Sequence, residues 1–174
     1  MMSRMAGFKF ATVCCCFLAL AACSKKNTPS LDGGRLDGGQ QGGLSGGNLS
    51  PLERLQQDFA TNVGDRIFFI VDQSNLTPEA QDTLGKQVAW LQSHPNVTVQ
   101  VEGHSDERGT REYNIALSAR RATAARGFLI SHGVPGNRIS SIAYGKERPA
   151  SLCDAEECWS QNRRAVTVIT GGAN

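Results

Sequence analysis

A glycine-rich stretch over residues 24–50 divides the chain, because a segment of this composition cannot form part of a folded core. It holds few large apolar side chains, and its Leu-Asp-Gly-Gly sequence at residues 31–34 repeats at residues 36–39. Such a segment cannot bury enough apolar surface to offset the chain entropy that folding would remove. We therefore expect a flexible tether over residues 23–58 and one folded domain over residues 59–174. As a random coil the tether would span roughly 30 Å, and fully stretched it would reach about 100 Å.

The first 22 residues are typical of a secretory signal peptide. Arg4 and Lys9 supply a positive start, and the apolar stretch of residues 10–20 is too short to span a bilayer comfortably. The Leu-Ala-Ala-Cys sequence that ends at Cys23 resembles the lipobox of bacterial lipoproteins, in which the cysteine is lipidated and becomes the new N-terminus. The alternative, a short membrane anchor that stays uncut, does not explain this motif. We therefore expect palmitate and further acyl chains on Cys23, since stable anchoring requires more than one chain, and Ser24 after it to permit transfer to the outer membrane.

The balance of charges gives no general case for nucleic-acid binding. The chain carries 18 basic and 16 acidic residues, and two of the basic ones lie in the signal peptide, which has no acid. Without these two, the mature chain has 16 residues of each sign and is formally neutral. Nucleic-acid-binding domains usually show a basic patch or stripe.

Two of the six cysteines remain in the expected domain. Three lie in the signal peptide and Cys23 takes the lipid, which leaves Cys153 and Cys158. A secreted domain in an oxidising compartment would pair them in a disulfide, and because the loop is small its entropic stabilisation is about 2 kcal/mol. The alternative, a metal site, lacks nearby ligands because the histidines are distant in sequence. We expect no metal, no cofactor and no effect of the disulfide on ligand chemistry.

Strands and helices alternate along the expected domain. Residues 66–71 form a β-branched and aromatic run that predicts a buried strand. Thr77 is a suitable N-cap for a helix with a proline and an acid in its first turn, and Pro95 closes that helix. The other predicted elements are a half-buried strand at 97–102, a helix at 111–131, a short strand at 138–143, a helical turn at 155–162 and a last strand at 164–170. This alternation indicates helices packed on a sheet.

The helix at 111–131 carries an arginine on its apolar face. At about 100° per residue, Arg121 falls in the middle of a face of apolar side chains, together with Asn114 and Ser118, whereas Arg120 points outward. A buried guanidinium needs a partner. One possibility is a structural ion pair, and the other is a cleft whose floor holds the arginine ready for a carboxylate.

The preceding segment, residues 103–110, combines two glycines with many polar side chains. It follows directly on a predicted strand, and loops at strand ends that face a helix N-terminus are common ligand sites. Asp106 could accept an ammonium group there while Arg121 and helix N–H groups take a carboxylate. Such a cleft would suit the zwitterionic end of an amino acid. His104 is expected to pack and hydrogen-bond below this loop.

Four segments carry a resemblance to a known family. They are residues 101–110, 114–122, 141–149 and 162–166, which read VEGHSDERGT, NIALSARRA, SIAYGKERP and NRRAV. These are similar to the hallmark segments of the OmpA-like peptidoglycan-binding domain, and the resemblance covers residues 65–170. Within that family the chain is most similar to the lipid-anchored members. The resemblance implies an α+β fold, a βαβαβ-type two-layer sandwich of helices on a mixed sheet, and a binding protein rather than an enzyme.

The resemblance also implies a ligand, the diaminopimelate of the peptidoglycan stem peptide. By the matching motif, Asp106 and Arg121 bind its amino and carboxylate groups, and Asp72 stands where the family often has another ligand-contacting acid. Family members frequently have Phe-Asp-x-Asp there, whereas this chain has Ile70 in place of the first acid. The expected supporting residues are Gly103, His104, Asn114 and Ser118.

By the same resemblance, the chain would be an outer-membrane lipoprotein with its domain in the periplasm, where it links the membrane to the wall. Its partners would be the stem peptide and Tol proteins, notably TolB, in envelope integrity and cell division. An enzyme is the first alternative, but the adjacent His104, Ser105 and Asp106 cannot face one another as a nucleophile and its base must. A flagellar stator or a membrane barrel would need membrane segments that do not fit before residue 59. A pure protein-interaction module is compatible with wall binding.

Overall fold

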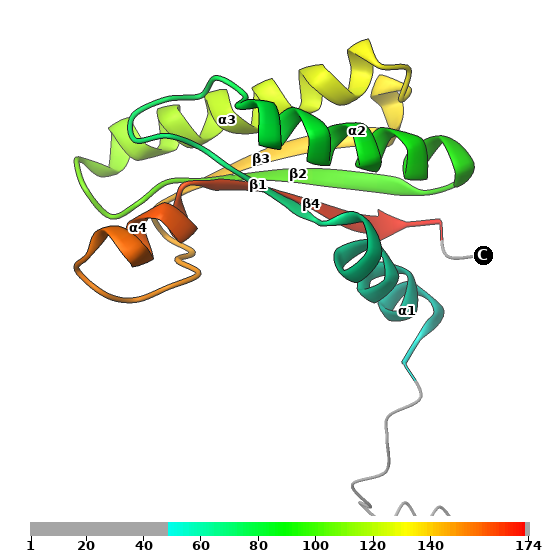
Figure 1. Ribbon diagram of the computed structural model, residues 1–174, viewed down its shortest axis with the longest axis horizontal. Coiled ribbons are helices and arrows are strands. Elements are labelled where there is room, and N and C mark those ends of the chain that lie inside the picture. Colours follow the sequence, from blue (N-terminus) through cyan, green and yellow to red (C-terminus); the bar gives the residue numbers. More distant parts are fainter. Residues whose placement is uncertain (1–48, 173–174) are drawn as a thin grey trace, which may run out of the picture. The chain divides into compact units, whose positions relative to one another are not determined.

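A four-stranded sheet organises the domain, and the computed structural model describes residues 49–172 (Figure 1). The strands are β1 (Arg66–Phe68), β2 (Thr98–His104), β3 (Ile139–Gly145) and β4 (Arg164–Gly171). Their order in the sheet is β1-β4-β2-β3. β2 and β3 are parallel, whereas β4 runs antiparallel to both β1 and β2. The predicted mixed sheet is therefore confirmed.

Two long helices, α2 (Pro78–Ser93) and α3 (Arg111–Ser131), lie together on one side of the sheet (Figure 1). Each begins after a threonine whose side chain accepts a hydrogen bond from the first turn, Thr77 from the N–H of Ala80 and Thr110 from that of Tyr113. The short helix α4 (Glu156–Asn162) lies on the other side, and a 3₁₀ turn (Gly136–Arg138) leads into β3. The predicted α+β class is confirmed.

A further helix, α1 (Pro51–Asp58), lies within the residues that the sequence analysis assigned to the tether, and a π-helical turn (Phe59–Val63) continues it. The folded part therefore starts before Phe59. The reason is a capping box: the Ser50 side chain accepts from the N–H of Glu53, and the Glu53 side chain accepts from the N–H of Ser50. The side-chain amide of Gln56 also donates to the carbonyl of Ile169 in β4, at 2.7 Å, so the helix is tied to the sheet.

The first strand differs from the prediction of a buried strand over residues 66–71. β1 ends at Phe68 and pairs with β4 alone, because it lies at the edge of the sheet. Ile67 and Phe69 point into the core, whereas Phe68 and Ile70 are 47% and 51% exposed. A run of apolar residues is thus compatible with an edge strand whose outer side chains remain in water.

The core lies between the sheet and the two long helices. Its buried apolar side chains include Ile67, Val99, Val101, Ile139, Ala165 and Ile169 from the strands and Leu84, Val88, Leu91, Ala122, Ala125 and Leu129 from the helices. β2 approaches α3 so closely that a Cβ on Gly103 would lie 1.9 Å from the carbonyl oxygen of Ser118. Pairing with β3 continues through His104, so the loop predicted over residues 103–110 begins at Ser105 instead.

Candidate ligand-binding site

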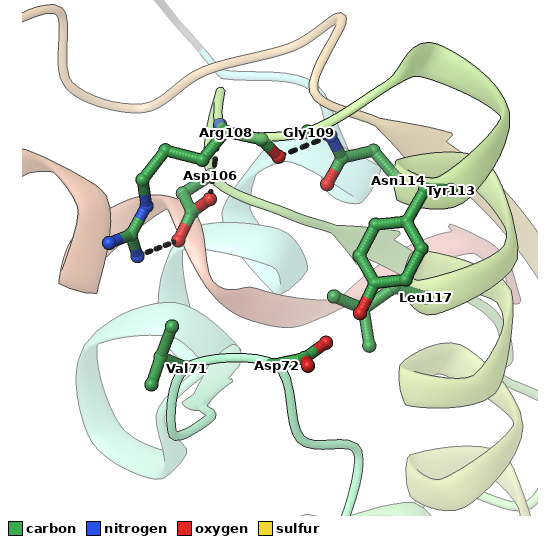
Figure 2. A pocket seen from close by; sticks show the side chains of 8 residues that line it. All are labelled: Val71, Asp72, Asp106, Arg108, Gly109, Tyr113, Asn114 and Leu117. Carbon is green, nitrogen blue, oxygen red and sulfur yellow. Dashed lines mark hydrogen bonds and ion pairs between the residues drawn. The ribbon is translucent and has the colours of Figure 1, made fainter.

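A cavity of about 360 Å³ opens where the segments that follow β1 and β2 meet the first turns of α3 (Figure 2). The segment after β1 contributes Val71 and Asp72, and the loop after β2 contributes Asp106, Arg108 and Gly109. Tyr113, Asn114 and Leu117 of α3 complete the lining. The structure thus brings two of the three predicted ligand-contacting residues, Asp72 and Asp106, into one cavity.

Asp106 is a buried carboxylate with cationic partners. The Arg108 guanidinium donates to its Oδ2 at 2.6 Å, the Arg108 N–H donates to its Oδ1 at 3.2 Å, and Arg163 Nη1 lies 3.4 Å from Oδ2. Burial by itself would raise the pKa of Asp106, but the hydrogen bonds and charge of Arg108, with the bond from Arg163, hold that pKa below its ordinary value. Asp106 is therefore ionised at neutral pH and carries a negative charge at the cavity wall.

Arg121 is completely buried beneath the cavity and is not among the residues that line it. Its guanidinium donates to three main-chain carbonyl oxygens, those of Gln73 and His104 at 2.9 Å and that of Ile70 at 3.2 Å. Burial lowers the pKa of Arg121, the nearby carboxylates of Asp106 and Asp72 partly oppose this shift, and the net value is about 10. The periodicity correctly predicted that Arg121 is buried. Its direct partners are carbonyls, rather than the carboxylate of a structural ion pair.

Asp72 occupies a turn that Arg121 holds in place. It is the one non-glycine residue with a positive φ, 57°, in the described part of the chain. This left-handed conformation is uncommon for residues with a side chain, although aspartate tolerates it better than most. The two carbonyls that Arg121 binds at Ile70 and Gln73 flank Asp72, so the guanidinium stabilises the turn that directs this carboxylate to the cavity.

The predicted supporting residues fix the loop and the helix around the cavity. Asn114 donates its amide hydrogens to the carbonyls of Arg108, at 2.8 Å, and Thr110, at 3.0 Å. The Ser118 hydroxyl accepts from the N–H of Gly145 at 2.9 Å, and so ties α3 to the end of β3. Of the four predicted supporting residues, Gly103, His104, Asn114 and Ser118, Asn114 alone lines the cavity.

His104 is buried beside Tyr144, with a ring-centroid distance of 5.5 Å. Burial, together with the nearby charges of Arg164 and Arg148, lowers its pKa to about 4. It is therefore neutral at physiological pH. Its packing role agrees with the sequence analysis, but neither ring nitrogen has a hydrogen-bond partner within the protein.

Several residues of the site were not predicted. Arg108 and Arg163 both bind Asp106, and Arg163 also donates to the carbonyl of Phe69 at 3.2 Å. Arg108 lies two residues from Asp106, a spacing that could have indicated the ion pair. Arg163 is distant in sequence and stands between α4 and β4, where no periodic pattern marks an inward side chain.

The remaining predictions concern metals, membranes and the cysteines. Among residues 49–172, no group of three His, Cys, Asp or Glu side chains could hold a metal ion, and no helix in that range is long and apolar enough to cross a membrane. Cys153 and Cys158 are joined in a disulfide with a Cα–Cα distance of 5.6 Å. Cys23 lies outside the described residues.

Known proteins similar to this chain agree with the resemblance read from the motifs. The sequence profile of the OmpA family matches residues 68–163. The peptidoglycan-associated lipoprotein of Brucella melitensis is 56% identical over 155 residues, which cover 88% of this chain and 87% of that protein. The peptidoglycan-associated lipoprotein of Rhizobium meliloti is 54% identical over 158 residues, covering 90% and 85%. The crystal structure of the peptidoglycan-associated lipoprotein from Burkholderia pseudomallei superposes with a TM-score of 0.62 at 35% identity and covers 70% of this chain and 100% of its own.

Proposed function

Because the chain belongs to the OmpA family, among the peptidoglycan-associated lipoproteins, we propose that it binds the diaminopimelate-containing stem peptide of peptidoglycan non-covalently. The family is one of binding proteins, and the chain is not an enzyme. One observation carries the proposal: the carboxylates of Asp72 and Asp106 line a single cavity, and the Arg121 guanidinium lies beneath it. A site with both signs of charge suits a ligand that ends in an ammonium and a carboxylate.

The two ends of the ligand would meet different groups. Its ammonium would bind Asp106 and Asp72 through charge-assisted hydrogen bonds. Its carboxylate would lie toward the N-terminus of α3, where the helix dipole favours negative charge, and toward Arg121. Arg121 is fully buried and donates to three carbonyls, so it would attract the ligand carboxylate through its charge from beneath the cavity wall.

Titration of the full-length protein with a diaminopimelate-containing muropeptide tests this assignment. Asp106→Ala or Arg121→Ala should weaken binding about tenfold or more, since hydrogen bonds to charged groups contribute about 1.5–3 kcal/mol. Arg120→Ala is the matched control, because Arg120 is exposed beside Arg121. Thermal melting checks that each variant is folded. Folded Asp106→Ala and Arg121→Ala proteins that sediment with purified sacculi as the wild type does would contradict the assignment.

We further propose that lipid on Cys23, including palmitate, anchors the protein in the outer membrane, and that residues 23–50 connect this anchor to the periplasmic domain at the wall. Support comes from the lipobox and from the named relatives, which are lipoproteins. Cys23→Ser should abolish the incorporation of labelled fatty acid. Label that still enters this variant would refute the anchor.

A protein partner is proposed for the same region. Tol proteins, notably TolB, would bind near the cavity, as part of the Tol-Pal system in envelope integrity and cell division. Ile70, Val71 and Tyr113 at or beside the cavity are 51%, 48% and 43% exposed, and exposed apolar surface of this kind suits protein contacts. Val71→Asp should weaken co-purification with TolB, whereas unchanged co-purification would place the partner elsewhere.

A further inference from the structure

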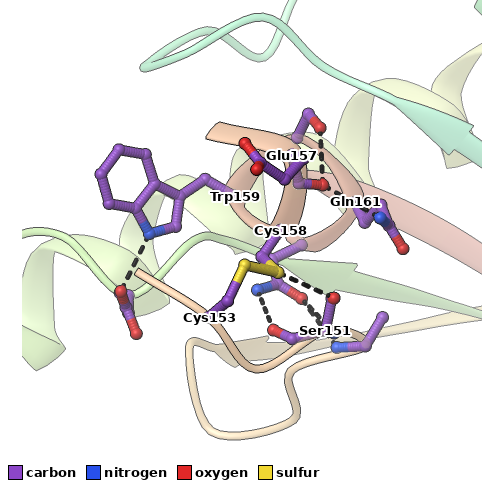
Figure 3. The surroundings of a disulfide bond; sticks show 10 residues. Ser151, Cys153, Glu157, Cys158, Trp159 and Gln161 are labelled. Carbon is purple, nitrogen blue, oxygen red and sulfur yellow. Dashed lines mark hydrogen bonds between the residues drawn. A yellow bond between two sulfur atoms is a disulfide. The ribbon is translucent and has the colours of Figure 1, made fainter. Parts of the chain in front are cut away.

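The disulfide lies next to Trp159, a side chain that contacts the loop lining the ligand cavity. Cys158 is the third residue of α4, and Trp159 follows it on the helix (Figure 3). The Trp159 indole N–H donates to the Glu107 carboxylate at 2.9 Å, and the Arg108 guanidinium lies 4.2 Å from the centre of the Trp159 ring. Trp159 therefore contacts both residues that follow Asp106 in the loop after β2.

Arg163, at the end of α4, makes the second connection. Its side chain is 7% exposed, its Nη1 lies 3.4 Å from Asp106 Oδ2, and its Nε donates to the carbonyl of Phe69 at 3.2 Å. The same guanidinium forms an ion pair with Glu156 in the first turn of α4. The N–H of Phe69 donates to the Arg163 carbonyl at 2.9 Å. Through these bonds Arg163 joins α4, the segment after β1 and the buried carboxylate of the cavity.

The short helix that presents Trp159 and Arg163 depends on local bonds. α4 has seven residues, and its N-cap residue Ala155 makes no side-chain capping bond. Helices of this length are marginal without tertiary support. The segment before it packs little, since Leu152 is 88% exposed. The disulfide and the Asn162 side chain, which accepts from the N–H groups of Ala150 and Ser151 and donates to the Ser151 carbonyl, hold this segment to the helix.

We propose that the segment of residues 150–163, which the disulfide between Cys153 and Cys158 constrains, is part of the binding machinery, with Trp159 and Arg163 as positioning residues for Arg108 and Asp106. The inference rests on the proposed stem-peptide site and differs from the sequence-based expectation that the disulfide has no effect on ligand chemistry. A carboxylate fixed by two arginines is already oriented when the ligand ammonium arrives, so less order must be imposed on binding. Removal of either positioning side chain frees the loop and the carboxylate to adopt other conformations.

The test is muropeptide titration of the full-length protein and of variants at the disulfide, Trp159, Arg163 and Arg138. Trp159→Ala and Arg163→Gln should each weaken binding about tenfold, the effect of losing one hydrogen bond or stacking contact to a charged group. Cys153→Ser/Cys158→Ser should weaken binding by about the same factor, because it loosens the segment that carries both side chains. Trp159→Phe keeps a ring under Arg108 and should lose less than Trp159→Ala. Arg163→Lys keeps a cation beside Asp106 and should restore part of the affinity. Arg138→Gln is the matched control, because Arg138 also binds main-chain carbonyls but lies at the start of β3.

A second readout separates positioning from a general loss of structure. Arg163→Gln should raise the pKa of Asp106, measured by the carboxyl-carbon chemical shift, and Arg163→Lys should reverse part of that rise. Suppose that the wild type binds the muropeptide, and that the folded Cys153→Ser/Cys158→Ser and Arg163→Gln proteins bind it equally well with an unchanged Asp106 pKa. That result would overturn this inference and leave the proposed function intact. Failure of the wild type to bind the muropeptide would overturn the proposed function itself.

Discussion

Two arginines hold the two ends of β2 in the same way, yet only one of them lies at a charged cavity. Arg121 binds the carbonyl of His104 at the end of β2, and Arg138 binds that of Val97 just before β2 begins. Each guanidinium binds three main-chain carbonyls in all, those of Ile70, Gln73 and His104 for Arg121 and those of Leu91, His94 and Val97 for Arg138. Both are therefore structural clamps that satisfy carbonyls outside regular strand and helix pairing.

The neighbours of the two arginines differ. Burial lowers the pKa of both, but the carboxylates of Asp106 and Asp72 oppose the shift at Arg121, whereas burial is the one cause identified at Arg138. A cavity of about 290 Å³ also lies near the start of β2, and no acidic or basic side chain other than His94 lines it. An arginine that binds main-chain carbonyls can thus be purely structural, as at Arg138. Carboxylates beside such an arginine, as at Arg121, make the region suitable for a charged ligand.

The largest expected effect comes from removing each clamp in turn. Arg121→Ala should lower the free energy of unfolding by about 3–5 kcal/mol, because it removes a fully buried guanidinium that is bonded to three carbonyls and attracted by two nearby carboxylates. Arg138→Ala should cost about 1–2 kcal/mol, since that side chain is partly exposed. Urea unfolding at neutral pH measures both. Equal losses would show that the two clamps are equivalent and that the carboxylates add nothing.

Muropeptide affinity sharpens the same contrast. Arg121→Lys keeps the charge but cannot bind three carbonyls in a fixed plane. It replaces Arg121→Ala in the binding test if the alanine variant does not fold. It should weaken binding, whereas Arg138→Ala should leave affinity unchanged. A loss of affinity in the Arg138 variant would mean that the two ends of β2 are coupled.

The sequence predicted these regions unequally, for physical reasons. The 3.6-residue period of α3 was sufficient to place Arg121 inside, because a long amphipathic helix has one orientation that buries its apolar face. Its acceptors could not be predicted, since main-chain carbonyls of the turn at Ile70 and Gln73 leave no side-chain pattern. Arg163 was missed for the same reason, because its partners are distant in sequence. Asp72 was identified by family resemblance, whereas its left-handed conformation follows from tertiary bonds.

The boundaries show a similar division. The bounds of α2 and α3 agree with their capping residues and apolar period, which are local signals. α1 was missed although Ser50 and Glu53 form a capping box, because the glycine-rich composition before it dominated the interpretation. The end of β2 was placed too early because Gly103 was read as a loop residue. In the structure this glycine is required inside the strand, where α3 approaches.

An effect of intermediate size concerns pH, and it also distinguishes the two ends of β2. His104 has a folded-state pKa of about 4, whereas an unfolded histidine titrates near 6.5. As pH falls from about 6.5 toward 4 the unfolded chain takes up a proton that the folded chain does not, so the free energy of unfolding decreases, by up to about 3 kcal/mol. The stability that this neutral histidine contributes is thus fully present above pH 6.5.

Urea unfolding of the wild type and of His104→Gln between pH 7 and pH 5 isolates this contribution. The wild type should lose stability across the interval, and the variant should lose less, because glutamine does not titrate. The comparison depends on the slope with pH, so any constant cost of the substitution cancels. If the free energy of unfolding changed with pH to the same extent in both proteins, His104 would not be the group that makes the domain less stable in acid.

The smallest expected effect lies in α3 beyond Arg121, where a glycine stands in open space. A Cβ on Gly127 would meet no atom within 4 Å, in contrast to Gly103, whose Cβ would lie 1.9 Å from the Ser118 carbonyl oxygen. Gly127→Ala should raise the free energy of unfolding by about 0.5–1 kcal/mol, because alanine is the better helix former and restricts the unfolded chain. If the ligand site depends on its own charges and not on the stiffness of α3, muropeptide affinity should stay at the wild-type value while urea unfolding shows the gain. An affinity that changes with this distant substitution would mean that the stability of α3 affects the cavity, so the ligand site would not be independent of the rest of the helix.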